Sequence, residues 1–244
     1  MKIGVKIHPD NPGYLKDIKN YIDFIELVAI EGKSYNFLKS NQLPVIIHSE
    51  DFNYQANLVN ADNNVVNKRY LEFLIDMVKK FKAPYIILNP GIKINNRCTV
   101  QNLSALLKKE YVKKVIIENQ PALKNKTYPF FGRNYDEIQA ILKQAGIGFC
   151  FDFAHAFASA FYFEKEPLRF CMDILELRPR HIHISNGRSM SFLDLHLHFT
   201  KGDFDMGKLK ELIPKDAWVT VDTTNDLLEQ LEEIAFLRGE QKSG

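Results

Sequence analysis

The sequence predicts an α/β fold, a (β/α)₈ TIM barrel formed as a single domain by residues 1–244. Two patterns and the chain length indicate this fold. Short apolar runs recur along the whole chain, and amphipathic helical patterns lie between them. This alternation is typical of a parallel sheet covered by helices. The length of 244 residues is close to the roughly 250 residues usual for such a barrel.

The predicted strands share one composition. Each run is short, rich in β-branched or aromatic residues, and apolar at nearly every position, as expected for a strand buried on both faces of a parallel sheet. Eight such runs occur, which is the barrel count. They cover residues 3–7, 23–29, 44–49, 85–90, 114–119, 148–153, 181–185 and 218–223.

The predicted helices carry apolar residues on one stripe. The clearest are 67–81, 101–111, 134–146, which closes on Gly146, and 224–238, which opens on an Asn or Asp cap. A further helix is predicted over 167–177, and the helices after the first two strands are expected to be short.

An open, doubly wound sheet is the alternative for eight strands. That fold normally carries a glycine-rich turn after its first strand, where a dinucleotide binds. The first turn here reads KIHPDNPG, residues 6–13, which lacks that fingerprint. The barrel is therefore favoured.

Composition limits the classes of function. Lys and Arg total 32 against 30 for Asp and Glu, so any affinity for nucleic acid must come from a local patch. The three cysteines form no CxxC pair, which argues against a zinc ribbon or a disulfide framework. No signal-peptide pattern or membrane-length apolar run occurs, so we expect a cytoplasmic protein without a membrane partner.

Polar side chains close nearly every predicted strand. In a barrel these ends meet on one face, where catalytic sites lie. Any one of these residues is most simply a cap or a satisfied core group, but eight in order favour a site. In chain order they are His8, Glu26, His48, Asn89, Glu118, Asp152, His183 and Asp222, and His155, Asp194 and His196 lie just beyond strands.

These ligand types suit divalent metals. Imidazole nitrogen and carboxylate oxygen together bind zinc, manganese or iron. A buried carboxylate such as Asp152, within the apolar stretch GFCFDFAHAFASA (148–160), costs several kcal/mol unless it is paired. A cation would pair it, and a hydrogen-bonded structural pair is the other reading. More than four such groups exceed one tetrahedral ion, so a cluster of two or three ions is expected.

Five segments together resemble the superfamily of endonuclease IV and the xylose-isomerase-like TIM barrels. They are HSEDFNYQANL (48–58), IIENQ (116–120), FDFAHAFASA (151–160), HISNG (183–187) and DLHLHFTKGDFD (194–205). The order and approximate spacing hold from the third predicted strand to the eighth. Local matches lean toward endonuclease IV, the metal-dependent apurinic/apyrimidinic endonuclease.

The resemblance implies the roles of the ligands. Glu118 would bridge two metals, one of them held with His48. Asp152, His183 and Asp222 would complete the shell of one ion, and His155, Asp194 and His196 would hold another. The implied cofactors are one to three divalent ions, with zinc expected first and manganese as the alternative.

This chain departs from the endonuclease IV pattern in several places. Asn89 stands where that family has His, and Asp222 stands where it has Glu. Three extra residues separate His48 from Tyr54, and the chain is shorter than is typical of that nuclease. An amide oxygen is a poor zinc ligand beside imidazole, so the ion held by His48 and Glu118 is the one in doubt.

The resemblance implies a phosphodiesterase that hydrolyses the DNA backbone 5′ to abasic sites, with Glu118 and Asp222 as catalytic residues. The alternative partner is a sugar or sugar phosphate, turned over by an isomerase or epimerase in which the same two carboxylates move a proton. A metal-binding barrel without turnover is the third reading. Predicted substrate-binding residues are Tyr54, Asn57, Asn89, Lys124, Lys126, Arg133 and Arg188.

Overall fold

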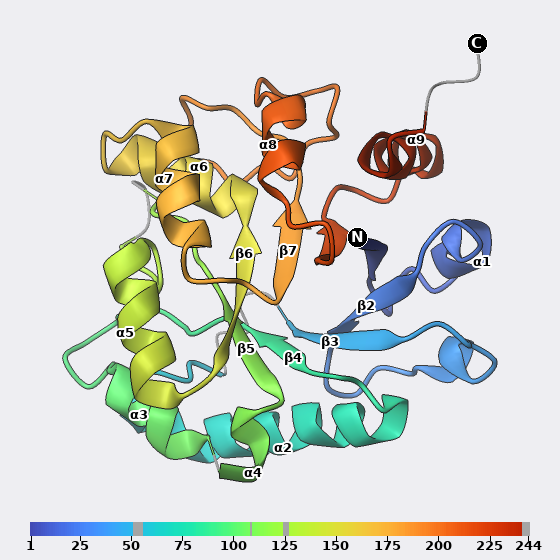
Figure 1. Cartoon of the computed structure of the whole chain (residues 1–244). Helices are drawn as coiled ribbons and strands as arrows, with labels where there is room; N and C mark the ends of the chain where they lie inside the picture. The colour runs from blue at the N-terminus through green and yellow to red at the C-terminus, as the bar shows by residue number, and fades with distance from the viewer. Residues whose placement is uncertain (51–55, 108, 124–126, 241–244) are drawn as a thin grey trace.

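The computed structural model describes residues 1–50, 56–107, 109–123 and 127–240. Its strands form a closed parallel barrel in chain order, which confirms the predicted fold. Figure 1 shows the strands in the middle of the molecule and the helices around them. The strands are β1 (Lys2–Ile7), β2 (Phe24–Ala29), β3 (Val45–Ser49), β4 (Ile86–Leu88), β5 (Val115–Glu118), β6 (Gly148–Asp152), β7 (His181–Ile184) and β8 (Trp218–Val221).

The helices cover the outside of the barrel. Those after the first two strands are short, as predicted. The set comprises α1 (Tyr14–Ile18), the 3₁₀ turns η1 (Asn36–Leu38) and η2 (Ala61–Asn63), α2 (Asn64–Phe81), α3 (Val100–Leu106), α4 (Lys109–Val112), α5 (Tyr135–Ala145), α6 (Phe153–Tyr162), α7 (Pro167–Leu175), α8 (Met206–Leu212) and α9 (Leu227–Arg238). None of the helices in the described part of the chain is long and apolar enough to cross a membrane.

One helix prediction was wrong. The segment 101–111 does not form one helix, because α3 ends at Leu106 and a separate α4 begins at Lys109. Leu107 between them has extended backbone angles (φ −79°, ψ 105°). Leu106 and Leu107 are both buried. Consecutive helical residues point about 100° apart, so the break at Leu107 lets both side chains pack inward.

Helix ends follow local capping chemistry. The Asn134 side chain accepts a hydrogen bond from the Glu137 amide at the start of α5, and Gly146 ends that helix with φ +68°. The predicted cap of the last helix is Asp226, whose side chain accepts the Glu229 N–H, and α9 begins at the next residue. Strand β6 runs directly into α6, which places His155 in the first turn of a helix.

The barrel interior has an apolar part and a polar part. Phe24, Ile46, Tyr85, Ile87, Ile116 and Cys150 form a buried cluster separate from the larger core between strands and helices. Gly4 makes room for the Phe24 ring, since a Cβ there would lie 2.4 Å from it. The carboxyl ends of the strands instead carry ionisable side chains, which the apolar layer holds in place from below.

Candidate metal centre

Four side chains at the carboxyl ends of the strands converge on one point, which we call the barrel centre. Glu118 ends β5, Asp152 ends β6, His183 lies in β7 and Asp222 follows β8. One ligand atom from each lies within 4.8 Å of the others. His183 Nδ1 is the common neighbour, at 2.5 Å from Glu118 Oε1, 3.7 Å from Asp152 Oδ2 and 3.6 Å from Asp222 Oδ2. All four residues are buried.

Asp152 divides its two carboxylate oxygens between two tasks. Its Oδ1 accepts the backbone N–H of His155 at 2.8 Å and so caps α6. Its Oδ2 is buried and accepts no hydrogen bond from any described residue. Asn119 fixes the backbone here, because its side chain bonds both the N–H of Asp152 (2.7 Å) and its carbonyl (2.9 Å). The free oxygen is thereby held toward the barrel centre.

A second group, which we call the loop centre, lies beside the first. His155 Nε2 and His196 Nε2 approach the same oxygen, Asp194 Oδ2, at 3.0 Å and 2.9 Å. The Nδ1 atoms of both rings donate to backbone carbonyls, of Asn119 at 2.7 Å and of Asp222 at 2.9 Å. Both rings therefore turn Nε2 toward the carboxylate. Asp194 Oδ1 is buried and has no hydrogen-bond partner among the described residues.

Protons on the histidines offset the negative charge of the carboxylates in these two centres. Burial alone would lower the pKa of His155, but Asp152 and Asp194 hold it well above the usual value. Burial would likewise lower the pKa of His196, but the Asp222 and Asp194 carboxylates raise it to about 10. Burial raises the pKa of Asp152. The imidazolium groups thus stand where a bound cation would place its charge.

The raised histidine pKa values make ion binding depend on pH. A metal ligand must be an unprotonated nitrogen. Because His155 and His196 bind protons near neutral pH, zinc must displace them, and we expect net proton release on binding and higher apparent affinity as pH rises toward 9. Titration calorimetry at one pH in buffers of different ionisation enthalpy measures that release. Binding heats that are identical in all buffers would contradict this prediction.

The position that the resemblance assigns to a third ion is built differently. His48 Nε2 lies 3.6 Å from Glu118 Oε2, so these two side chains do face one another. The Asn89 side-chain oxygen, however, accepts a hydrogen bond from Gln120 Nε2 at 2.9 Å. Asn89 and Gln120 therefore form an amide pair where that nuclease family has an imidazole.

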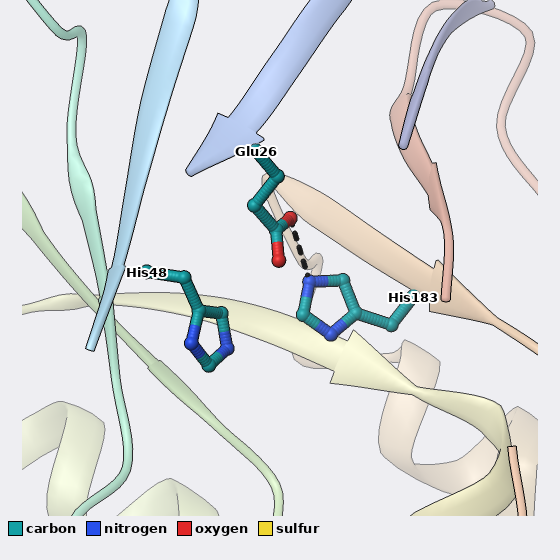
Figure 2. A group of neighbouring side chains, drawn as sticks. All are labelled: Glu26, His48 and His183. Carbon is teal, nitrogen blue, oxygen red and sulfur yellow. Dashed lines mark hydrogen bonds and ion pairs between the residues drawn. The ribbon is translucent and has the colours of Figure 1, made fainter. Parts of the chain in front are cut away.

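Below the barrel centre lie two more charged residues: Glu26, which the sequence places at a strand end, and Lys6, which the sequence did not single out. Lys6 on β1 and Glu26 on β2 are partners in the parallel register. Lys6 Nζ donates to Asp222 Oδ2 at 2.6 Å and lies 3.8 Å from Glu26 Oε1. Glu26 is wholly buried and bonds His183, as Figure 2 shows together with His48. His8, one of the predicted strand-end residues, does not join either centre. Its side chain is 44% exposed and lies near Asp10.

A buried carboxylate outside the barrel ties the two centres together. Glu233 on α9 accepts the backbone N–H of Phe199 at 2.9 Å, His198 Nδ1–H at 2.9 Å and the Thr223 hydroxyl at 2.8 Å. Phe199 lies in the same β7–α8 connection as Asp194 and His196, and Thr223 follows Asp222. One side chain therefore anchors both ligand-bearing loops.

The predicted substrate-binding residues lie in different places. Tyr54, Lys124 and Lys126 fall outside the described residues. Asn57 is buried and bonds both backbone groups of Ile92, at 2.8 Å and 3.2 Å. Arg133 pairs with Glu137 at 2.5 Å, and Arg188 is exposed after β7.

Two cavities open beside the centres. One, of about 260 Å³, is lined by residues of both centres together with Lys6, Asn89 and Gln120. The other, of about 130 Å³, lies against Asn57, Ile92 and Phe130. They share Asn89 and Gln120, so the amide pair lines both cavities.

The residues present fit divalent metal. Both centres combine imidazole nitrogen with carboxylate oxygen, the donors that zinc and manganese accept. Each also contains a buried carboxylate oxygen, Asp152 Oδ2 or Asp194 Oδ1, that no described residue satisfies. Such atoms are costly unless a cation pairs with them. Burial raises the pKa of the Cys150 thiol to about 12, which makes this neighbour a poor ligand because metals bind the thiolate.

The chain belongs to the family of xylose isomerase-like TIM barrels, whose profile matches residues 33–239. It is 26% identical over 219 residues to apurinic-apyrimidinic endonuclease 1 of Plasmodium falciparum (isolate 3D7). That match covers 80% of this chain and 36% of the relative, so the chain spans about a third of the relative's length.

Solved structures share the fold over nearly the whole chain. A D-tagatose 3-epimerase-like protein superimposes with a TM-score of 0.71 at 18% identity, covering 98% of each chain. Endonuclease IV from Thermus thermophilus also gives a TM-score of 0.71, at 16% identity and 98% coverage of both chains. These similarities show the barrel fold. Because members of this superfamily are enzymes, they support the inference that this chain is an enzyme.

Proposed function

We propose that this protein is a metal-dependent phosphodiesterase that hydrolyses the DNA backbone 5′ to abasic sites. The observation that carries the proposal is the pair of neighbouring centres, because two adjacent ions are a recurring arrangement for phosphoryl transfer. Asp222 links them: its Oδ2 lies 3.6 Å from both His183 Nδ1 and His196 Nδ1. The endonuclease relative supports DNA as the substrate.

The residues would divide the work as follows. Glu118, Asp152, His183 and Asp222 would hold one ion, and His155, Asp194 and His196 another. When bound, zinc or manganese would supply an activated water and offset the charge that develops on a phosphodiester.

The remaining polar groups of the larger cavity would orient the substrate. The Lys6 ammonium and the Gln120 amide line that cavity and can donate to phosphate oxygens. The exposed Arg188 would contact the DNA backbone farther out. Contacts from Tyr54, Lys124 and Lys126 stay predictions.

A sugar or sugar-phosphate isomerase or epimerase is the second candidate. The specific observation in its favour is the amide pair of Asn89 and Gln120, which leaves the barrel centre as a single four-ligand site. Glu118 and Asp222 approach His183 Nδ1 from different strands, at 2.5 Å and 3.6 Å. Two carboxylates placed around one ion could abstract and return a proton next to a sugar carbonyl.

Incision of a duplex oligonucleotide with one abasic site tests the leading proposal. We expect zinc- or manganese-dependent cleavage 5′ to the lesion by the wild type. Glu118→Gln should lose about 10²- to 10³-fold in rate, on the order of the effect of removing one strong electrostatic group from an active site. Glu176→Gln, which changes an exposed carboxylate that lines neither cavity, is the matched control and should cleave normally.

Absence of incision with zinc bound would reject the nuclease. A panel of ketoses, aldoses and their phosphates, assayed with the same two variants, would then test the isomerase. Zinc bound with no turnover of either substrate class would leave a metal-binding barrel.

A further inference from the structure

We propose that Glu26 is a positioning residue that fixes which nitrogen of His183 binds the ion. The inference rests on the metal centre of the proposed function and not on its substrate. His183 Nε2 lies 2.9 Å from Glu26 Oε2 (Figure 2). Glu118 Oε1 contacts the other ring nitrogen, Nδ1, which donates to it in this structure. With the Nε2 proton held by Glu26, Nδ1 is the nitrogen left to bind an ion, and it is the atom that faces Glu118, Asp152 and Asp222.

A chain of hydrogen bonds holds the Glu26 carboxylate for this task. The Thr220 hydroxyl donates to Glu26 Oε2 at 2.6 Å, and His181 Nε2 lies 3.0 Å from the same oxygen. Tyr85 lies on the far side of His181, with its hydroxyl 2.9 Å from His181 Nδ1. If that hydroxyl donates, the His181 proton sits on Nε2 and is donated to the Thr220 hydroxyl oxygen at 2.8 Å. Glu26 Oε2 thus accepts hydrogen bonds from Thr220 and His183, and His181 supports it through Thr220.

Burial argues that this carboxylate is retained for a purpose. Glu26, His181 and Thr220 are each 0% exposed inside the barrel. A carboxylate removed from water there costs several kcal/mol that partners only partly return. An apolar side chain would fill the same space without that cost, as the neighbouring interior residues do. Orientation of a metal-binding imidazole is a known use of such a carboxylate.

The competing reading is that Glu26 is itself a ligand. Glu26, His48 and His183 also bring one ligand atom each within 4.8 Å of the others. Two features favour the hydrogen bond. The 2.9 Å separation between Nε2 and Oε2 is that of a charge-assisted hydrogen bond. An ion on Nε2 would also have to share the His183 ring with the ion at Nδ1.

Zinc affinity in graded variants tests the proposal. Glu26→Gln keeps an oxygen that can accept the Nε2 proton but loses the charge, whereas Glu26→Met keeps the approximate volume and removes the acceptor. Changing such outer partners typically weakens binding about 10- to 100-fold. We expect Glu26→Met to weaken zinc binding at the barrel centre by about 100-fold and Glu26→Gln by about 10-fold, measured by competition with a chromophoric chelator.

The identity of the metallated His183 nitrogen is a second measurement, and a purely structural role of Glu26 would not change it. In ¹⁵N-histidine spectra of the zinc-loaded protein, wild type should show His183 metallated at Nδ1 and protonated at Nε2. Glu26→Met should show a mixture of metallated nitrogens or loss of the signal. Glu176→Gln is the control, since it removes the charge of an exposed carboxylate that lines neither cavity, and it should leave the His183 signals unchanged.

Three results would overturn the proposal. Unchanged zinc affinity in both Glu26 variants would show that Glu26 does not position His183. Loss of one whole zinc from the stoichiometry, with His183 metallated at Nε2 in wild type, would make Glu26 a ligand. A wild type that binds zinc with His183 unmetallated would reject the barrel centre itself, whereas failure of the DNA assay alone would leave this inference intact.

Discussion

Asp152→Asn is expected to abolish zinc binding at the barrel centre while keeping the protein folded. The substitution replaces the unsatisfied oxygen Oδ2 by an amide nitrogen, or presents a neutral amide oxygen, and neither matches a carboxylate as a ligand. The cap on α6 survives, because Asn accepts the His155 N–H as well as Asp does. Burial disfavours the charged form of Asp152, so the neutral amide should cost the metal-free protein nothing. Zinc content after gel filtration should fall by one ion.

Asp152→Ala separates the two tasks of this side chain. It removes the ligand and the cap together, and loss of an N-cap costs about 1 kcal/mol. The alanine variant should therefore unfold about 2–4 °C below the asparagine variant when both are metal-free, as measured by scanning calorimetry. Full zinc content in Asp152→Asn would show that Asp152 is not a ligand, and equal midpoints would show that the cap contributes no stability.

Removing metal is expected to lower the thermal midpoint strongly. An ion that binds only the folded state at 1,000 times its Kd stabilises it by about 4.1 kcal/mol. For a domain of this size each kcal/mol shifts the midpoint by about 2–4 °C, so zinc-loaded protein should unfold about 8–16 °C above protein stripped with a chelator. Differential scanning calorimetry with and without chelator measures the shift.

A variant without either centre is the control for that experiment. Asp152→Asn combined with Asp194→Asn removes from each centre the carboxylate that has an unsatisfied oxygen. Its midpoint should not respond to zinc or to chelator. A wild-type midpoint that is the same in both conditions would contradict a metal centre built into the fold.

The strands of this barrel could be predicted because their burial on both faces leaves a continuous apolar run. The run 148–153 and β6 (Gly148–Asp152) differ by one residue, and Asp152 marks the end because it must leave the apolar layer. The break at Leu107 could not be predicted in this way. Helical periodicity in 101–111 is intact, and only the packing of two consecutive leucines against the barrel decides where the helix ends.

The sequence predicted the site residues that end strands, but it did not predict Lys6 within β1 or Gln120 after β5. Lys6 precedes the last residue of β1, and reading the strand end alone selects His8, which lies outside the strand. Lys6 could have been found from the alternation of inward positions along a barrel strand, which places it beside Glu26. The role of Gln120 depends on its distance from Asn89, and no pattern along the chain encodes that distance.

The hydrogen bonds between Glu233 and two loops would affect the distance between ions bound at the two centres. The ligands of the loop centre and Asp222 of the barrel centre come from different loops, yet both are anchored to the same carboxylate of α9. If both centres bind ions, the distance between the ions would therefore depend on how α9 packs on the barrel as well as on the strands. Substitutions that repack α9, a helix that supplies no ligand, would then change that distance and with it the size of the group that fits between the ions.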